Sequence, residues 1–86
     1  MNLSMDYIRR QLEDEYIVIH HVRGDSVGIK FLRQTSRVLL ERLCFEARRD
    51  GQTTFVENDI TYVMTKNRDG SFSISQQDLN KEVELG

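Results

Sequence analysis

The sequence predicts an all-α domain, in which a short helix, a loop, a long central helix, a second loop and a short helix follow one another. The main observation is a stretch of about 25 residues between Ser26, which can cap a helix, and Gly51, which can end one. On a helical projection, the apolar positions of this stretch are spread around most of the circumference. A shorter amphipathic repeat precedes it in residues 4–15.

The N-terminal segment has the pattern of a helix. Ser4 can cap a helix in which Met5, Ile8 and Leu12 fall at i, i+3 and i+7. We therefore expect a first helix over about residues 4–15.

Residues 16–22 are rich in β-branched and aromatic side chains, so we expect them to be extended. Two possibilities stay open at this point. The segment is either a true strand or a short connecting loop that pairs with another chain.

The central helix is expected to be about 37 Å long, at about 1.5 Å of rise per residue. Its apolar residues form three stripes, which are Leu32, Leu39 and Leu43, then Phe31, Val38 and Phe45, then Leu40, Cys44 and Ala47. A helix that is apolar on so many sides has to be covered on several sides. The flanking segments offer too little surface for this, so the pattern predicts a partner chain.

The segment after Gly51 is ambiguous. Residues 52–56 are expected to be extended, and the alternation that follows Asp59 favours a strand. Acidic residues ahead of Ile60, however, favour the first turn of a short helix. We expect one domain over residues 1–75, followed by a flexible acidic tail over residues 76–86.

One stretch resembles a known family. The sequence ARRDGQTTFVENDI, at residues 47–60, resembles the end of the long helix, the second loop and the third helix of archaeal and eukaryotic histones. Thr54 and Phe55 take the place of a Thr-Ile/Val pair, and Asp59 and Ile60 take the place of an Asp-Ile/Val pair. The resemblance implies a histone fold.

The same alignment covers most of the chain. It places IRR, at residues 8–10, where histones of the nucleosome have a similar Ile-Arg-Arg in their first helix. Gln52 stands where histones have an arginine that clamps the aspartate of the third helix. Asp59 is therefore expected to pair instead with Arg48 or Arg49.

The resemblance implies two sets of functional residues. Head-to-tail pairing with a second histone-fold protein would bury a dimer interface made of Ile8, Leu12, Leu32, Leu39, Leu43, Phe55, Ile60 and Val63. Paired loops at the end of the dimer would contact the DNA backbone, without reading its sequence, through Arg9, Arg10, Arg48, Arg49, Thr53 and Thr54.

Composition limits the other function classes. The formal net charge is −2, which argues against a protein that coats nucleic acid by charge alone. His20 and His21 are adjacent in an extended segment and point to opposite sides, so we expect no metal and no cofactor. No Ser, Cys or His stands in a context that suggests activation, and we expect no enzymatic activity.

Two functional hypotheses follow. The first is a nuclear histone-fold subunit that forms a heterodimer within a chromatin, kinetochore or transcription complex. The alternative is a small α+β adaptor or inhibitor, of phage or bacterial origin and cytoplasmic, that acts by protein–protein binding. In this alternative a small antiparallel sheet, formed by residues 16–22, 53–56, 60–66 and 71–75, packs on the long helix.

Overall fold

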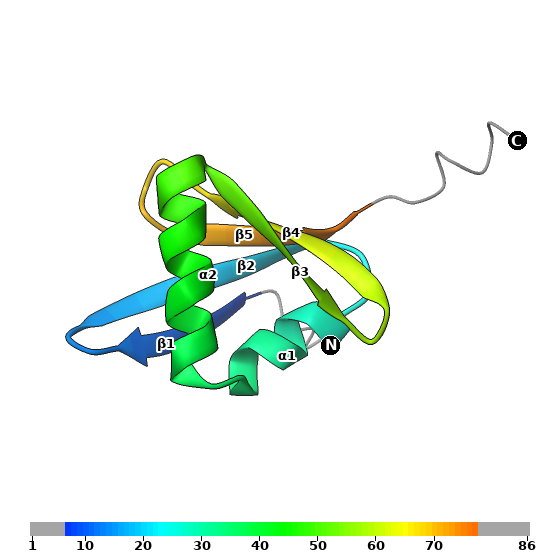
Figure 1. The fold of residues 1–86 in the computed structure, drawn as a ribbon, viewed down its shortest axis with the longest axis horizontal. Helices are drawn as coiled ribbons and strands as arrows, with labels where there is room; N and C mark the ends of the chain where they lie inside the picture. Colours follow the sequence, from blue (N-terminus) through cyan, green and yellow to red (C-terminus); the bar gives the residue numbers. More distant parts are fainter. Residues whose placement is uncertain (1–6, 78–86) are drawn as a thin grey trace, which may run out of the picture.

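Two strands, two helices and three further strands follow one another in the computed structural model, which describes residues 7–77 (Figure 1). The elements are β1 (Tyr7–Leu12), β2 (Glu15–Arg23), α1 (Val27–Gln34), α2 (Arg37–Asp50), β3 (Gln52–Glu57), β4 (Ile60–Lys66) and β5 (Phe72–Gln76). The strands form one five-stranded sheet in the order β1-β2-β5-β4-β3.

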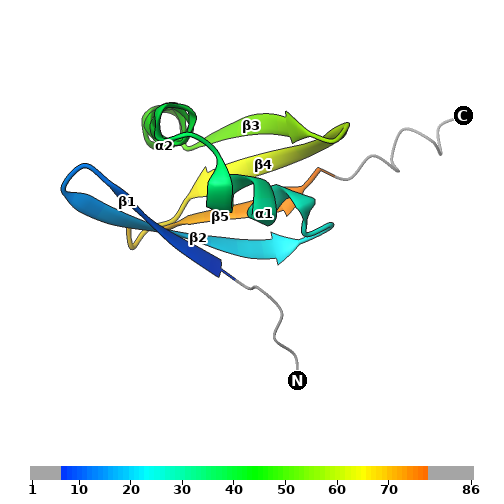
Figure 2. The same ribbon diagram turned by 90° about the horizontal axis from the view of Figure 1, so that it is seen from below.

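The sheet is mixed, and its two helices lie on the same face. The β1–β2, β3–β4 and β4–β5 pairs are antiparallel, whereas β2 and β5 are parallel. Parallel strands cannot be joined by a tight hairpin. The connection from β2 to β5 therefore contains α1, α2, β3 and β4. Seen edge-on, both helices lie on one side of the sheet, and no other element of residues 7–77 covers the opposite side (Figure 2).

The core lies between the sheet and the helices. Each strand turns alternate side chains toward the helices, and the helices contribute the opposing layer. The buried apolar residues are Ile8, Leu12, Ile17, Ile19, Ile29, Leu32, Leu40, Leu43, Cys44, Ala47, Phe55, Tyr62, Met64, Phe72 and Ile74.

The expected first helix is wrong over its described part, because Tyr7–Leu12 forms β1. Residues 4–6 of that expectation lie outside the described residues. Ile8 and Leu12 fit a helical spacing, but with Arg10 between them they also fit the two-residue period of a strand. Glu13 has a φ of 54°, which closes a turn and lets β1 pair with β2 from Leu12↔Glu15 onward.

The continuous central helix is also wrong, since it is broken between α1 and α2. Thr35 is extended, with φ −70° and ψ 167°, and it ends α1. Ser36 then starts α2, where its side-chain oxygen accepts a hydrogen bond from the Leu39 amide at 3.1 Å. The three apolar stripes therefore belong to two shorter helices, and both can face the same sheet.

The third helix, expected to begin near Ile60, is a strand. Asn58 and Asp59 have φ values of 59° and 66°, and Glu57 pairs directly with Ile60. A two-residue connection with both φ values positive is the turn that matches the twist of a β-hairpin. The acidic run that suggests a first helical turn is thus the turn between β3 and β4.

The all-α histone fold is therefore incorrect, and the protein has an α+β fold. The alternative arrangement is closer, because its four expected strand segments fall on β2, β3, β4 and β5. It still misses β1 and the parallel pairing of β2 with β5. Of the expected tail, Gln76 ends β5, and residues 78–86 lie outside the described residues.

The residues expected at a dimer interface contribute largely to the core of the chain itself. Five are buried there, namely Ile8, Leu12, Leu32, Leu43 and Phe55. Leu39 and Ile60 pack against that core, while Val63 alternates with Tyr62 and Met64 and so points to the uncovered face. Most of the apolar surface that suggests a partner chain is thus covered within one chain by the sheet, but Val38 and Phe45 of α2 stay exposed.

Gly28 marks the closest approach of α1 to the sheet. A Cβ at this position would lie 2.6 Å from Cε1 of Tyr62, whose side chain is fully buried. We expect Gly28→Ala to lower the free energy of unfolding by about 1–2 kcal/mol, because overpacking outweighs the gain in helix propensity. Urea denaturation measures this, with Lys30→Ala in the same helix as the control. An alanine variant as stable as the wild type would contradict this packing.

Candidate functional site

Within residues 7–77, one face of the sheet has no helix or strand packed on it. The strand register defines which side chains it carries. They are Tyr7, Arg9 and Gln11 of β1, Tyr16, Val18, His20, Val22 and Arg23 of β2, Ser73 and Ser75 of β5, Thr61, Val63 and Thr65 of β4, and Gln52, Thr54 and Val56 of β3. We call this set the uncovered face.

Large apolar side chains are exposed on the uncovered face. The exposed fractions are 57% for Tyr7, 60% for Tyr16, 64% for Val22 and 61% for Val56. Scattered single apolar side chains are ordinary on protein surfaces, but here four share one side of one sheet. The uncovered face is therefore a candidate for recognition of another molecule.

The β1–β2 half of the uncovered face holds an aromatic and basic cluster. Cζ of Arg9 lies 4.6 Å from the centre of the Tyr16 ring, which is cation–π contact. The rings of Tyr7 and His20, directly opposite each other in the register, have centroids 6.2 Å apart. The four side chains thus form two contacting pairs on the sheet surface.

A hollow of about 470 Å³ borders this cluster. Tyr16, Val18 and His20 line one side of it, and the turn before β5 lines the other. In that turn, the hydroxyl of Ser71 donates a hydrogen bond of 2.7 Å to Asp69. Hydrogen bonds from Ser71 hold the pKa of the Asp69 carboxyl below its ordinary value, so this carboxylate stays ionised and engaged.

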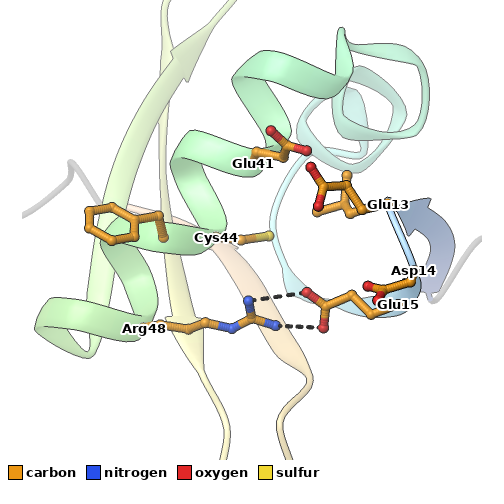
Figure 3. A pocket seen from close by; sticks show the side chains of 8 residues that line it. Glu13, Asp14, Glu15, Glu41, Cys44 and Arg48 are labelled. Atoms are coloured by element: carbon orange, nitrogen blue, oxygen red, sulfur yellow. Dashed lines mark hydrogen bonds and ion pairs between the residues drawn. The ribbon is translucent and has the colours of Figure 1, made fainter.

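A second hollow, of about 230 Å³, lies on the helix side between the β1–β2 turn and α2 (Figure 3). Its rim carries Glu13, Glu15 and Glu41, and the guanidinium of Arg48 donates to both carboxylate oxygens of Glu15 at 3.3 and 3.4 Å. Cys44 lines the same hollow from α2.

The Cys44 thiol is not arranged for nucleophilic chemistry. Burial raises its pKa to about 11, and the positive charge of Arg48 offsets this only in part. The thiolate is the reactive form of cysteine, so a thiol with this pKa reacts poorly near neutral pH. The second hollow therefore offers no activated nucleophile.

The six residues expected to contact DNA do not form one site. Arg9 and Thr54 lie on the uncovered face, but on β1 and β3 at opposite edges of the sheet. The hydroxyl of Thr53 donates to Glu46 at 2.8 Å, and Arg48 pairs with Glu15.

Arg10 and Arg49 are likewise engaged within the chain. Nη1 of Arg10 donates to the backbone oxygens of Leu32 and Thr35, at 3.1 and 2.6 Å. Arg49 pairs with Asp50 at 2.8 Å. The expected pairing of Asp59 with Arg48 or Arg49 is accordingly not found.

Sequence reasoning did not single out the apolar and aromatic part of the uncovered face. Its four exposed apolar residues, which are Tyr7, Tyr16, Val22 and Val56, occupy no defining position of a sequence motif. Only their alternation with buried neighbours could have identified them. For Tyr7 that signal depends on residues 7–12 being a strand, which is the assignment that the helical spacing obscured.

Comparison of the chain with protein-family models, with curated proteins and with solved structures finds no match. Among the described residues, neither helix combines the length and hydropathy that crossing a bilayer requires. Over the same residues, no group of three or more His, Cys, Asp or Glu side chains is placed to hold a metal ion.

From the Arg10 contacts we predict that substitution of Arg10 lowers the stability of the fold. Arg10→Met removes both hydrogen bonds to the end of α1 and leaves two carbonyl groups without that donor. We expect a loss of about 1–3 kcal/mol in the free energy of unfolding. Arg9→Met, on the exposed side of the same strand, serves as the control and should change stability by less than about 0.5 kcal/mol. Equal effects in denaturant titrations would contradict the inward contact of Arg10.

From the burial of Cys44 we predict a slow rate of alkylation in the folded protein. Since the pKa of Cys44 is about 11 in the folded protein, alkylation by iodoacetamide at neutral pH should be at least about 100-fold slower than in concentrated guanidinium chloride. Cys44 is the only cysteine, so mass spectrometry reports its modification without ambiguity. Folded and unfolded rates within tenfold of each other would show that the thiol is accessible and activated.

Proposed function

We propose that this protein is a non-catalytic module that binds another protein through the uncovered face of its sheet. The observation that carries the proposal is the contrast between the two sheet faces. One packs on α1 and α2 and supplies the core, whereas the other exposes Tyr7, Tyr16, Val22 and Val56. The proposal keeps the adaptor or inhibitor role of the alternative hypothesis.

The chemistry of the uncovered face supports a protein partner. Tyrosine and arginine are enriched at protein interfaces and among the residues that dominate binding energy. Arg9 and Tyr16 are already in contact, so little side-chain order has to be gained on binding. Val18 and Val22, on the same face of β2, add apolar area that a flat partner surface can cover.

A nucleic-acid partner receives less support from the same structure. Four of the six residues proposed to contact the DNA backbone are engaged in contacts within the chain. The net charge of −2 adds no long-range attraction toward phosphate. The histone-type heterodimer and the nuclear location were both inferred from the all-α fold. That fold is incorrect, so neither is part of the proposed function.

A matched pair of variants tests the proposed function. Tyr16 and Phe45 are both 60% exposed, and each has an arginine over its ring, but Tyr16 is on the uncovered face and Phe45 is on α2. In affinity capture from extract of the source cells, we expect Tyr16→Ala to lower recovery of a stoichiometric partner by about tenfold or more.

Phe45→Ala should leave that recovery unchanged, and circular dichroism should show that both variants are folded. The proposed function fails if a stoichiometric partner is retained equally by both variants, or is lost only with Phe45→Ala. Loss of recovery after nuclease treatment would instead identify a nucleic acid as the bound molecule.

A further inference from the structure

Charge is distributed unevenly between the two sides of the molecule. The strand positions of the uncovered face include Arg9, Arg23 and His20 but no aspartate or glutamate, although the chain contains 14 acidic residues. On the helix side both signs of charge are present, since α1 and α2 carry six lysine and arginine residues together with Glu41, Glu46 and Asp50. The strand positions of the uncovered face, by contrast, carry two arginines and no carboxylate.

Arg9 is presented for binding rather than used internally. Its guanidinium lies over the Tyr16 ring, and within residues 7–77 it makes no ion pair or hydrogen bond. A ring beneath a guanidinium limits its motion but leaves its N–H groups able to donate. Arg10, its neighbour, points the other way and is occupied by backbone carbonyls.

Arg23 reaches the same face because of an irregularity in β2. The register between β2 and β5 shifts between His21 and Arg23, so that Arg23 stands opposite Ser75. Ser75 alternates with the buried Ile74 and therefore points to the uncovered face. Arg23 makes one hydrogen bond, from Nη2 to the backbone oxygen of Gln76 at 3.2 Å, and its other donors have no partner among the described residues.

Two carboxylates border this region, and one of them, Glu15, is paired with Arg48. Asp69 lies in the turn before β5 and shares the 470 Å³ hollow with Tyr16, Val18 and His20. It accepts hydrogen bonds from the hydroxyl and the backbone amide of Ser71 and makes no ion pair with Arg9 or Arg23. Within residues 7–77, Arg9 and Arg23 therefore have no carboxylate as an ion-pair partner.

We propose that the partner of the uncovered face presents carboxylate groups beside apolar side chains, and that these carboxylates bind Arg9 and Arg23. This inference rests on the proposed function, since it names the chemistry of the partner at the same face. Charge complementarity of this kind selects the partner and its orientation and speeds association. Tyr7 and Tyr16, with Val18 and Val22 of β2, contribute the apolar contact.

The apolar part of the uncovered face favours an acidic protein over a nucleic acid, which is also an anion. Val18, Val22, Val56 and Val63 lie among the outward-facing residues and offer no donor to phosphate or base edges. Single-stranded nucleic acids are bound by stacking on aromatic side chains along a strongly basic groove. Two arginines and this many valines fit an acidic, partly apolar protein segment better.

Two synthetic peptides of equal length test the inference directly. One alternates glutamate with valine, the other alternates lysine with valine, and both are capped at their ends. The full-length, ¹⁵N-labelled protein is titrated with each peptide and followed by NMR. We expect the glutamate peptide to shift amide signals of β1 and β2, and its binding to weaken at least about threefold between about 0.05 M and about 0.5 M salt. The lysine peptide should leave these signals unchanged.

Charge reversal supplies the decisive variant. The double variant Arg9→Glu, Arg23→Glu should lose binding of the glutamate peptide and gain binding of the lysine peptide. The control Lys30→Glu, Arg33→Glu changes net charge equally on α1 and should behave as the wild type. Should the double reversal unfold, Arg9→Gln with Arg23→Gln must still weaken the glutamate peptide. Equal shifts with both peptides, or no shifts on β1 and β2, would overturn the inference. It would also be overturned if a thymidine oligonucleotide bound the uncovered face more tightly than the glutamate peptide does.

The capture experiment separates this inference from the proposed function. If Tyr16→Ala abolishes partner recovery while the double arginine reversal does not, the face binds a protein but not through carboxylates. If neither variant changes recovery, the proposed function itself is wrong.

Discussion

The parallel pairing of β2 with β5 is the constraint on which the rest of the structure depends. Because parallel neighbours cannot be joined by a short turn, two helices and two strands are inserted between them. Both helices fall on one side of the sheet, so apolar side chains alternate inward only toward that side. The division of the sheet into a covered and an uncovered face follows from this connection, and so does the candidate binding surface.

The interior of the molecule is organised around the three central strands. Ile19, Phe72, Ile74, Tyr62 and Met64 are fully buried on β2, β5 and β4. The helices meet this row with Ile29, Leu32 and Leu40, which are equally inaccessible. Burial of this kind is the dominant favourable term in folding. Arg10 adds a directional contact, since it joins the edge strand β1 to the end of α1.

Some of this arrangement could be predicted from the sequence, and the failures have physical causes. The extended character of residues 16–22 and the helix end at Gly51 were correct, because β-branched runs and a left-handed glycine act locally. A helix does begin after Ser26, but the Ser26 side chain makes no capping hydrogen bond, and Asp25 accepts from the Val27 amide instead. The spacing of Ile8 and Leu12 satisfied both helix and strand, and only pairing with β2 decides between them.

The break at Thr35 and Ser36 shows a different cause of failure. A serine within an apolar helical pattern is a weak local signal, and here it caps a second helix whose direction is set by the sheet below it. The candidate site was missed because Tyr16 becomes a neighbour of Arg9, and Tyr7 a neighbour of His20, only through the pairing of β1 with β2. The basic character of that surface was hidden in a net charge of opposite sign.

The position of β5 also governs how the chain can be built during synthesis. It is the last strand of the sheet to be made, yet it occupies the centre of the sheet. Until it emerges from the ribosome, β1–β2 and β3–β4 are two separate hairpins, each with an unpaired edge and an apolar side, and isolated hairpins are at best marginally stable. Chains that lack β5 therefore expose unpaired hairpin edges, at which edge-to-edge aggregation can start.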